Sequence, residues 1–321
     1  MAKERWLAAR RAELLPVPYF HLVFTLPHAL NALAQGNLRL LYNMLFESVS
    51  ATLIEFGANP RWLGGEIAAT LILHTWGQTL VQHLHLHCLV AAGALQSDGH
   101  WIRSRRGFLF PVQALSQVFR GKLLATLTRA FDTSALNLAG PTATLAQARA
   151  RQRFFSALCE HQWVVYAKKP FGGPQQVLDY LGRYTHRVAI SNNRLARIEE
   201  ARVSFRYKDY ARGNRRKVLT LEAGEFIRRF LLHVLPRGFM RIRHYGLLAN
   251  RAKRLKLAQA RSALDQPPPP RPSQPESIEA FWLRVAQRDI LQCPHCHAGR
   301  MVIIASLHSQ LARGPPAPPR A

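Results

Sequence analysis

Three histidines alternate with leucines in the segment His83-Leu84-His85-Leu86-His87. Successive side chains of a β-strand point to opposite faces, so in a strand the three imidazoles would share one face. Neighbouring imidazoles would then stand ~7 Å apart at the backbone, close enough for two of them to bind one divalent cation. A single histidine is more often a core residue, but three in alternation favour a metal site.

Two tyrosines, Tyr180 and Tyr184, stand four residues apart and would lie on the same face of a helix. A phenol that attacks a phosphodiester forms a phosphotyrosine ester and frees a 3′-hydroxyl, so rejoining needs no ATP. Because the ordinary pKa of a phenol is ~10, such a nucleophile needs a metal that polarises the phosphate. The pair alone is more typical of a core or stacking role. The tyrosine pair supports this phosphodiester chemistry only in combination with the histidines and with the charge of the chain.

The basic residues predict a polyanionic partner. Lys and Arg number 44 against 18 Asp and Glu, which gives a formal net charge of +26. Residues 183–261 contain 21 of these basic residues and only five acidic ones. Tyr207 and Tyr210 are interleaved with them, a pattern that suits phosphate contact and base stacking on single strands, with a solvated strand face as the alternative. The predicted DNA contacts are Arg183, Arg187, Arg206, Lys208, Arg212, Arg215, Arg216, Lys217, Arg241 and Arg243.

The cysteines are too few for a disulfide framework, and reduced thiols fit a cytoplasmic protein. Cys293-Pro-His-Cys296 has the spacing of half a zinc site, with His295 and His297 beside it. No second pair exists in the sequence, so partial zinc binding at most is predicted. The remaining two thiols are those of Cys88 and Cys159.

The hydropathy pattern predicts an α+β chain. Strands are predicted at 19–26, 66–75, 84–92 and 163–167, the second and third forming a hairpin around 76–81. Helices are predicted at 29–56, 112–131, 144–161 and 175–184. The order strand, helix, strand, strand, helix, strand is that of a split βαβ, ferredoxin-like sheet.

Further segments predict a linker, a disordered tail and the absence of a membrane span. Residues 266–274 (QPPPPRPSQ) predict a stiff linker, and the proline-rich tail after Pro315 predicts disorder. No apolar run approaches the ~20 residues of a membrane span, and the N-terminal residues lack the apolar region of a signal peptide. A cytoplasmic location without membrane association is therefore expected.

Five motifs carry a family resemblance: HLHLHCLVAAGALQSDGHW (83–101), YLGRYTHRVAIS (180–191), FRYKDY (205–210), FLLHVLP (230–236) and RIRHYGLLANR (241–251). With them the chain resembles the two-tyrosine, HUH-type rolling-circle transposases of the insertion sequence 91 family, from about Arg5 to Ile303. The resemblance implies that the metal motif falls on His85 and His87 and the nucleophiles on Tyr180 and Tyr184. It implies Mg²⁺ or Mn²⁺ as the cofactor. The third metal ligand stays open among His186, Gln78 and His83.

The resemblance also implies a division of the chain and a reaction. Members of the family begin with a cysteine-rich zinc-binding region, whereas no cysteine precedes Cys88 here, so an N-terminally shortened protein is expected. The expected parts are a remnant of that region (1–18), an HUH catalytic core with helical insertions (19–195), a basic DNA-binding extension (196–262), a proline-rich linker (263–277), and a C-terminal segment with the C-x-x-C pair and a disordered tail (278–321).

The expected function is transposition of a bacterial insertion sequence. Single-stranded element ends and target DNA would be cut and rejoined through 5′-phosphotyrosine intermediates. A replication-initiation nuclease or relaxase remains an alternative with the same chemistry, and a catalytically inactive DNA-binding remnant is an alternative of another class.

Overall fold

The computed structural model describes residues 7, 10–168, 175–176, 178–179, 182, 189–210, 212–267, 276–302 and 304–305. The chain divides into two compact units, Met1–Pro269 and Pro270–Ala321. The division falls inside the proline-rich stretch predicted to be a linker. In the described part, no helix is both long and apolar enough to cross a bilayer.

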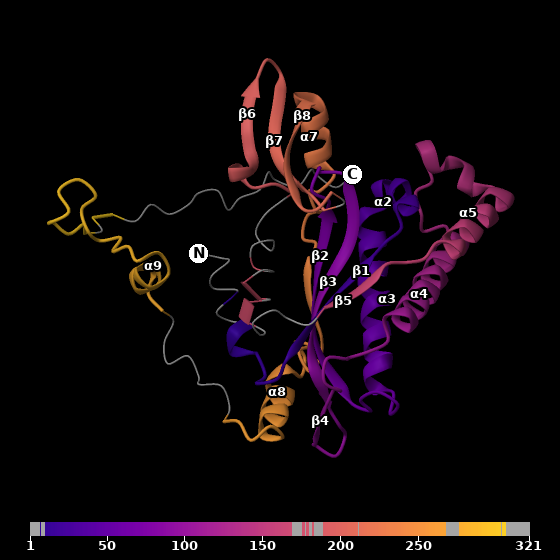
Figure 1. Ribbon diagram of the computed structural model, residues 1–321, viewed down its shortest axis with the longest axis horizontal. Coiled ribbons are helices and arrows are strands. Elements are labelled where there is room, and N and C mark those ends of the chain that lie inside the picture. The colour runs from indigo at the N-terminus through magenta and orange to yellow at the C-terminus, as the bar shows by residue number, and fades with distance from the viewer. Residues whose placement is uncertain are drawn as a thin grey trace, which may run out of the picture. The chain divides into compact units, whose positions relative to one another are not determined.

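The larger unit contains nearly all of the regular secondary structure (Figure 1). Its strands are β1 (Tyr19–Thr25), β2 (Glu66–Trp76), β3 (Gln82–Leu95), β4 (Trp101–Arg103), β5 (Val165–Lys168), β6 (Leu195–Glu199), β7 (Arg202–Asp209), β8 (Arg215–Glu222) and β9 (Ile242–Gly246). Its helices are α2 (Asn31–Gly36), α3 (Leu38–Ala58), α4 (Val112–Asp132), α5 (Ala148–Glu160), α7 (Ala223–Leu231) and α8 (Lys253–Ser262), with short 3-10 turns at His28–Leu30, Gly140–Ala146 and Asn192–Arg194.

A six-stranded sheet forms the centre of this unit. Its strand order is β5-β1-β3-β2-β9, with β4 paired to β3, and the pairs are antiparallel. Because α3 connects β1 to β2 and α4 lies between β3 and β5, strands β1, β2, β3 and β5 have the split βαβ, ferredoxin-like topology. The predicted α+β fold is confirmed. Strand β9 was not predicted, since it lies in the segment assigned to the basic extension.

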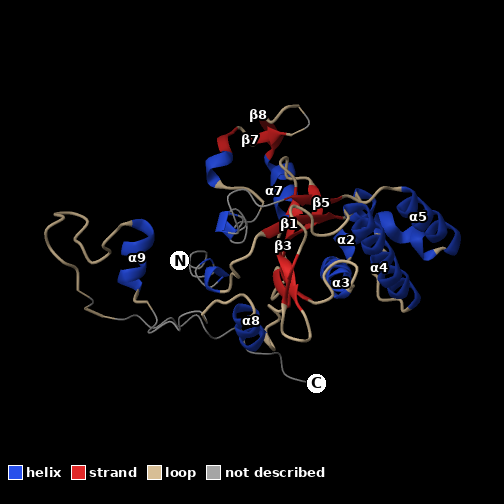
Figure 2. Cartoon of the chain, turned by 60° about the horizontal axis from the view of Figure 1, so that its bottom comes forward, coloured by secondary structure: helices blue, strands red, loops and turns tan. Residues whose placement is uncertain are grey.

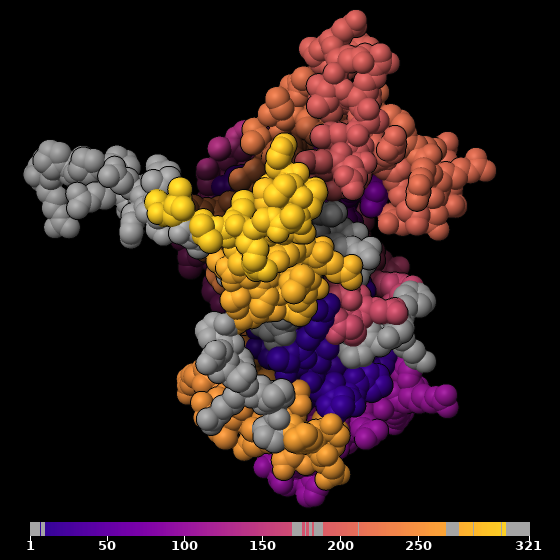
Figure 3. Space-filling view, turned by 90° about the vertical axis from the view of Figure 1, so that its left-hand side faces the viewer, coloured from indigo at the N-terminus to yellow at the C-terminus, as the bar shows by residue number. Residues whose placement is uncertain are grey.

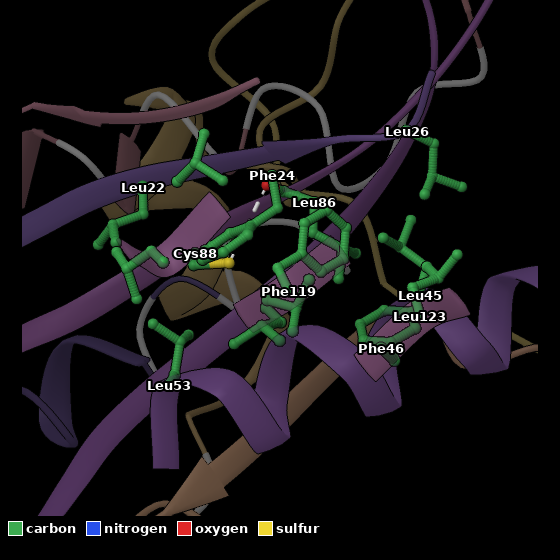
Figure 4. Packing of buried hydrophobic residues seen from close by; sticks show 14 of the residues in the cluster. Leu22, Phe24, Leu26, Leu45, Phe46, Leu53, Leu86, Cys88, Phe119 and Leu123 are labelled. Atoms are coloured by element: carbon green, nitrogen blue, oxygen red, sulfur yellow. Dashed lines mark hydrogen bonds between the residues drawn. The ribbon is translucent and has the colours of Figure 1, made fainter. Parts of the chain in front are cut away.

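Helices α3 and α4 cover one face of the sheet (Figure 2). Figure 4 shows Leu22, Phe24, Leu86 and Cys88 of the strands packed against Phe119 and other helix side chains. Each fully buried Leu or Phe of this core contributes about 1.5–3 kcal/mol. The helix predicted at 29–56 is interrupted at Asn37, whose buried amide donates to the carbonyl oxygens of Leu33 and Asn137 and so ends one helix before the next begins.

A second apolar cluster covers part of the opposite face. Tyr19, Ile72 and Leu89 lie on that face and pack with residues from distant parts of the chain. These partners include Leu7 and Leu15 near the N-terminus, Leu178, and Leu257 of α8. The face opposite α3 and α4 is therefore closed along part of its length by segments from both ends of the unit.

A three-stranded sheet with order β6-β7-β8 packs against α7 and the turn between β2 and β3. Leu80 in that turn is fully buried against Phe205 of β7, although its φ of 61° is unfavourable for a side chain with a Cβ. Arg229 of α7 and His233 donate to the carbonyl oxygens of Thr79 and Leu80. The small sheet thus fixes the tip of the β2–β3 hairpin.

The C-terminal unit contains helix α9 (Ile278–Ala286) and a cysteine-containing turn. The Ser277 side chain accepts a hydrogen bond from the amide of Ala280 and caps the helix at its N-terminus. A single antiparallel bridge joins Gln292 to Arg300 and closes the turn.

Candidate metal centre and its surroundings

Strands β2 and β3 bring three histidines together near the tip of their hairpin. His74 lies directly opposite His85, and His87 follows two residues later on β3. One ring nitrogen from each lies within 4.8 Å of the other two. Their exposed fractions are only 4%, 8% and 7%. The result is a buried set of three imidazole nitrogens that could hold one metal ion.

The three imidazoles lie on the face of the sheet opposite α3 and α4. Leu84 and Leu86 belong to the core beneath those helices, so strand alternation directs His85 and His87 to the other face. On β2 the same alternation separates His74 from Leu73. Because the side chains come from paired strands rather than from loops, their backbone positions are fixed by the sheet.

A fourth histidine, His21 of β1, contacts this cluster from the neighbouring strand. Its Nε2 lies 2.7 Å from Nδ1 of His87, and the two rings are nearly parallel with centroids 5.0 Å apart. A hydrogen bond to the outer nitrogen of an imidazole fixes its orientation and its tautomer, as is usual for metal-binding histidines.

The protonated nitrogen of His85 follows from its hydrogen bond. Nδ1 lies 2.8 Å from the carbonyl oxygen of His83, which can only accept. Nδ1 therefore carries the proton, and Nε2 presents its lone pair to the centre of the cluster. There Nε2 of His85 lies 3.2 Å from Nε2 of His87. The donor set thus fits a metal ion that accepts nitrogen ligands.

Burial keeps the clustered imidazoles neutral. Desolvation lowers the pKa of His85 to about 3 and that of His21 to about 4. The pKa values of His74 and His87 are lowered well below the ordinary range, first by desolvation and then by neighbouring positive charge. Neutral imidazole is the form that binds metals, so the cluster needs no deprotonation near neutral pH.

His74 was not among the candidate ligands predicted from the sequence. Of those candidates, His83 pairs with His28 (Nδ1 to Nε2, 3.0 Å). Gln78 accepts a hydrogen bond from the amide of Lys208 at 3.3 Å. His186 lies outside the described residues. The sequence did offer a signal for His74, because this histidine lies in the apolar strand predicted at 66–75, directly before the predicted hairpin turn.

The two-tyrosine segment lies only partly within the described residues. Tyr180, Tyr184, Arg183 and Arg187 are outside them. Gln175, Gln176, Leu178, Asp179 and Gly182 are helical, as predicted for 175–184. Leu178 is buried in the cluster on the histidine face of the sheet, and Asp179 forms an ion pair with Arg11 (2.6 Å). The described part of this segment therefore packs on the same face of the sheet as the histidines.

Predicted DNA contacts gather on the small sheet. The register pairs Arg206 with Val218 and Lys208 with Arg216, so these side chains share the face opposite the buried Phe205. Figure 3 shows the segments of this sheet and of α7, coloured salmon to orange, at the molecular surface. Exposed basic residues here are Arg206, Lys208, Arg212, Arg215 and Arg216.

Aromatic and acidic side chains modify this basic surface. The ammonium of Lys208 lies 5.2 Å from the ring centroid of the exposed Tyr210. Lys217, on the half-buried face of the sheet, forms an ion pair with Asp209 at 2.7 Å. Its charge is therefore partly compensated, whereas Tyr210 and Lys208 present a ring and a cation together.

Arg241 and Arg243 occupy different environments. Arg241 lies over the ring of Trp76 (5.6 Å), and Trp76 stacks on His74, so this guanidinium is beside the histidine cluster. Arg243 lies 4.2 Å from the ring centroid of Phe46 and donates to Asn43 (2.6 Å), both residues of α3. It is therefore packed on the side of the sheet away from the histidines.

The Cys293 and Cys296 thiols lie on one turn of the C-terminal unit. The amide of Cys293 donates to Gly299, and the amide of Gly299 donates to the sulfur of Cys296 (3.3 Å). Among the described residues, no third potential ligand joins these sulfurs in a metal-binding group. Both thiols therefore lie on one turn, and partial zinc binding by them stays a prediction.

Comparisons with known proteins agree with the transposase resemblance that the sequence motifs carry. Residues 68–256 match the Y2_Tnp family, described as "Putative transposase". The chain is 48% identical to "Putative transposase y4qJ" of Sinorhizobium fredii over 100% of this chain and 80% of that protein. It is 30% identical to "Transposase for insertion sequence element IS801" of Pseudomonas savastanoi pv. phaseolicola over 98% of this chain and 74% of that protein.

Part of the chain aligns with the solved structure "Conjugative Relaxase TrwC in complex with mutant OriT Dna". It aligns with 14% identity and a TM-score of 0.29 over 54% of this chain and 68% of that chain.

Proposed function

The chain belongs to the Y2_Tnp family and is an insertion-sequence transposase, and from that premise we propose that it cuts and rejoins single-stranded DNA with tyrosine nucleophiles beside a histidine-bound divalent cation. Tyr180 and Tyr184 are the proposed nucleophiles. His74, His85 and His87 are the proposed metal ligands, and His74 replaces the three earlier candidates for the third position.

One observation carries the proposal: three neutral imidazoles converge on one rigid sheet face of a strongly basic protein. Three buried nitrogens within 4.8 Å of one another fit one cation better than they fit separate packing roles. A divalent cation held there would polarise the scissile phosphate and neutralise the charge that develops on it. Because the donors are imidazoles, we favour Mn²⁺ over Mg²⁺, which prefers oxygen ligands.

The proposed cut is a displacement at phosphorus. The phenolic oxygen of one tyrosine forms a bond to the phosphorus while the bond from phosphorus to the 3′-oxygen breaks. The phenol loses its proton, and the departing oxygen gains one to become a 3′-hydroxyl. The phosphate stays on the tyrosine as a 5′-ester. Attack by a different 3′-hydroxyl reverses these steps and joins the strands, and the second tyrosine serves the second strand.

The histidines around the site would hold protons at defined atoms. His85 already carries its proton on Nδ1, where it donates to His83. For Nε2 of His87 to bind a cation, its proton must be on Nδ1, which lies 2.7 Å from Nε2 of His21. His21 then accepts this hydrogen bond. His21 is thus a proposed positioning residue that selects the metal-binding tautomer of His87.

Single-stranded DNA is the proposed substrate because the exposed basic surface also presents an aromatic ring. Arg206, Lys208 and Arg216 would contact phosphates, and Tyr210 would stack on a base. Beside the histidines, Arg241 would add a positive charge near the scissile phosphate. Element ends and target DNA are the proposed partners.

Formation of a covalent adduct tests this function. The protein is incubated with Mn²⁺ and labelled single-stranded DNA that carries candidate element ends, and adducts are resolved on a denaturing gel. Wild type is compared with Tyr180→Phe, Tyr184→Phe, the double variant and His85→Ala. Tyr166→Phe is the matched control, since Tyr166 is an exposed tyrosine outside the motif (52% exposed).

We expect an adduct in wild type and in the Tyr166→Phe control, and none in the double variant or in His85→Ala. An adduct that persists in the double variant would assign the attack to another nucleophile. Tight DNA binding by wild type without any adduct would instead identify a DNA-binding protein that lacks this chemistry. Joining of two different DNA molecules, rather than closure at a single origin, would separate transposition from the replication-type reaction.

A further inference from the structure

The cysteine turn of the C-terminal unit has a definite backbone geometry. The amide of Cys293 donates to the carbonyl oxygen of Gly299 at 2.8 Å, and the amide of His297 donates to that of Cys293 at 3.0 Å. These bonds fold residues 293–299 back on themselves, and the bridge between Gln292 and Arg300 closes the base. Both thiols are thereby held on one short turn.

This geometry suits sulfur in its thiolate form. The amide of Gly299 donates to Sγ of Cys296 at 3.3 Å. Thiolates rather than thiols bind zinc, so the turn is prepared for a soft divalent cation.

The turn supplies two ligands, whereas a closed structural zinc site requires four. Within the part of the chain that the structure describes, neither remaining cysteine lies on the turn. Cys88 is buried in the sheet core, and Cys159 lies on α5 of the other unit. The triad of His74, His85 and His87 is the metal-binding group found among the described residues, and neither Cys293 nor Cys296 belongs to it.

We propose that a second copy of the chain supplies the missing pair, so that Cys293 and Cys296 of two copies bind one zinc ion and link two transposase molecules. The four sulfurs satisfy tetrahedral zinc, and two identical half-sites form the self-complementary contact of a two-fold dimer. Binding converts the thiols to thiolates and releases their protons to solvent.

Exposure and charge favour this partner. Cys296 is exposed, so a second turn can approach its sulfur. The chain carries +26 overall, but residues 276–302 contain three arginines and three acidic residues and have no formal net charge. Two copies can therefore meet at this unit without the repulsion that their basic surfaces would impose elsewhere. The basic residues in this segment are Arg284, Arg288 and Arg300.

A cobalt titration of the full chain tests the link independently of DNA cleavage. The protein is freed of metal under reducing conditions and titrated with Co²⁺. Near-ultraviolet charge-transfer absorption from thiolate to cobalt reports the cysteine site alone, since the histidine cluster has no sulfur ligand. Light scattering follows the molar mass with and without Zn²⁺. The variants are Cys293→Ser/Cys296→Ser and, as a matched control, Cys159→Ser, which removes an exposed thiol elsewhere.

We expect the thiolate signal to saturate at one sulfur-bound Co²⁺ per two chains, counted apart from cobalt at the histidine cluster, and the molar mass to double when Zn²⁺ is added. Both effects should vanish in Cys293→Ser/Cys296→Ser and persist in Cys159→Ser. Saturation at one Co²⁺ per chain without a change in mass would overturn the proposal in favour of a site within one chain. Absence of any thiolate signal would overturn it as well. Neither result would bear on the adduct assay, so the two proposals fail separately.

Discussion

The histidine cluster and the basic surface of the small sheet are both arranged by strand alternation, but they differ in burial. His74, His85 and His87 are each less than 9% exposed and are kept neutral by desolvation. Arg206, Lys208 and Arg216 are exposed on the small sheet and project into solvent. The first region requires exact placement of a few ring nitrogens, whereas the second needs only a sufficient density of positive charge.

This difference predicts how each region responds to substitution. Loss of one ligand from a three-ligand cluster leaves an incomplete coordination shell, so the effect should be large and confined to metal binding. Loss of one surface cation removes one of many phosphate contacts, so the effect should be modest, graded and dependent on salt. Metal affinity and DNA affinity should therefore be separable by mutation.

The largest effect is expected from His74→Ala. Mn²⁺ affinity should fall more than about 100-fold, because even the loss of a residue that only orients a ligand costs about 10–100-fold in comparable sites. Single-stranded DNA affinity without metal should stay unchanged. Calorimetry or electron paramagnetic resonance of free Mn²⁺ measures the first quantity, and fluorescence anisotropy measures the second.

His244→Ala is the matched control for this prediction. His244 is a half-buried histidine on the same sheet and contacts Thr70 (3.0 Å), but it does not belong to the triad. It should retain the Mn²⁺ affinity of the wild type. Full affinity in His74→Ala would instead show that another residue completes the shell, with Gln78, His83 and His186 as the sequence-based candidates.

The next effect concerns His21, whose Nε2 contacts Nδ1 of His87 at 2.7 Å. His21→Ala should weaken Mn²⁺ binding about 10–100-fold, because the metal-binding tautomer of His87 loses its acceptor. His21→Gln places an amide oxygen near that position and should recover part of the affinity. Equal affinity in wild type and His21→Ala would show that His21 only packs against the cluster.

The sequence was sufficient to predict much of this architecture. Alternation along 83–87 correctly placed His85 and His87 on one face of a strand, and the order of strands and helices correctly gave the split βαβ sheet. Both depend on local periodicity, which the sequence displays directly. The predicted roles of Tyr180 and Tyr184 remain predictions.

Other features depended on pairing that local patterns do not specify. Trp76 pairs with Gln82 at the end of the β2–β3 hairpin. If the pairing continued regularly from there, His74 would lie opposite Leu84. A β-bulge between His74 and Trp76 shifts the pairing by one residue and brings His74 opposite His85. Strand β9 was missed for a related reason: its basic residues suggested a DNA surface, whereas its partner β2 is distant in the sequence.

A smaller effect is expected on the basic sheet. Arg206→Ala/Arg216→Ala removes two exposed charges from neighbouring strands of one face. Affinity for single-stranded DNA should fall, and the slope of log affinity against log salt should become shallower by about 1.4, at about 0.7 per lost phosphate contact. Mn²⁺ affinity should not change. Anisotropy titrations at several salt concentrations provide the slope.

The matched control for that pair is Arg129→Ala/Arg149→Ala, which removes two exposed arginines from the α4 and α5 helices. Its salt slope should equal that of wild type. If both pairs lowered the slope equally, binding would depend on the total charge of the chain rather than on the small sheet.

The smallest effect on DNA binding is expected at Arg243, although the sequence placed it among the DNA contacts. Its register partner on β2 is Leu71, a residue of the core beneath α3, whereas the neighbouring His244 pairs with Thr70. Its guanidinium packs on Phe46 and Phe239 (4.2 and 5.0 Å) and donates to Asn43. These contacts orient the charge toward α3 and away from the proposed DNA path.

Arg243→Met and Arg243→Ala separate packing from charge at this position. Either substitution should change DNA affinity by less than about two-fold and leave the salt slope unaltered, since no phosphate contact is lost. Arg243→Ala should lower the free energy of unfolding by about 1–3 kcal/mol through lost packing and the unsatisfied Asn43, and Arg243→Met by less, because its side chain still covers Phe46. A salt slope that fell by about 0.7 in both variants would place Arg243 on the DNA-binding surface after all.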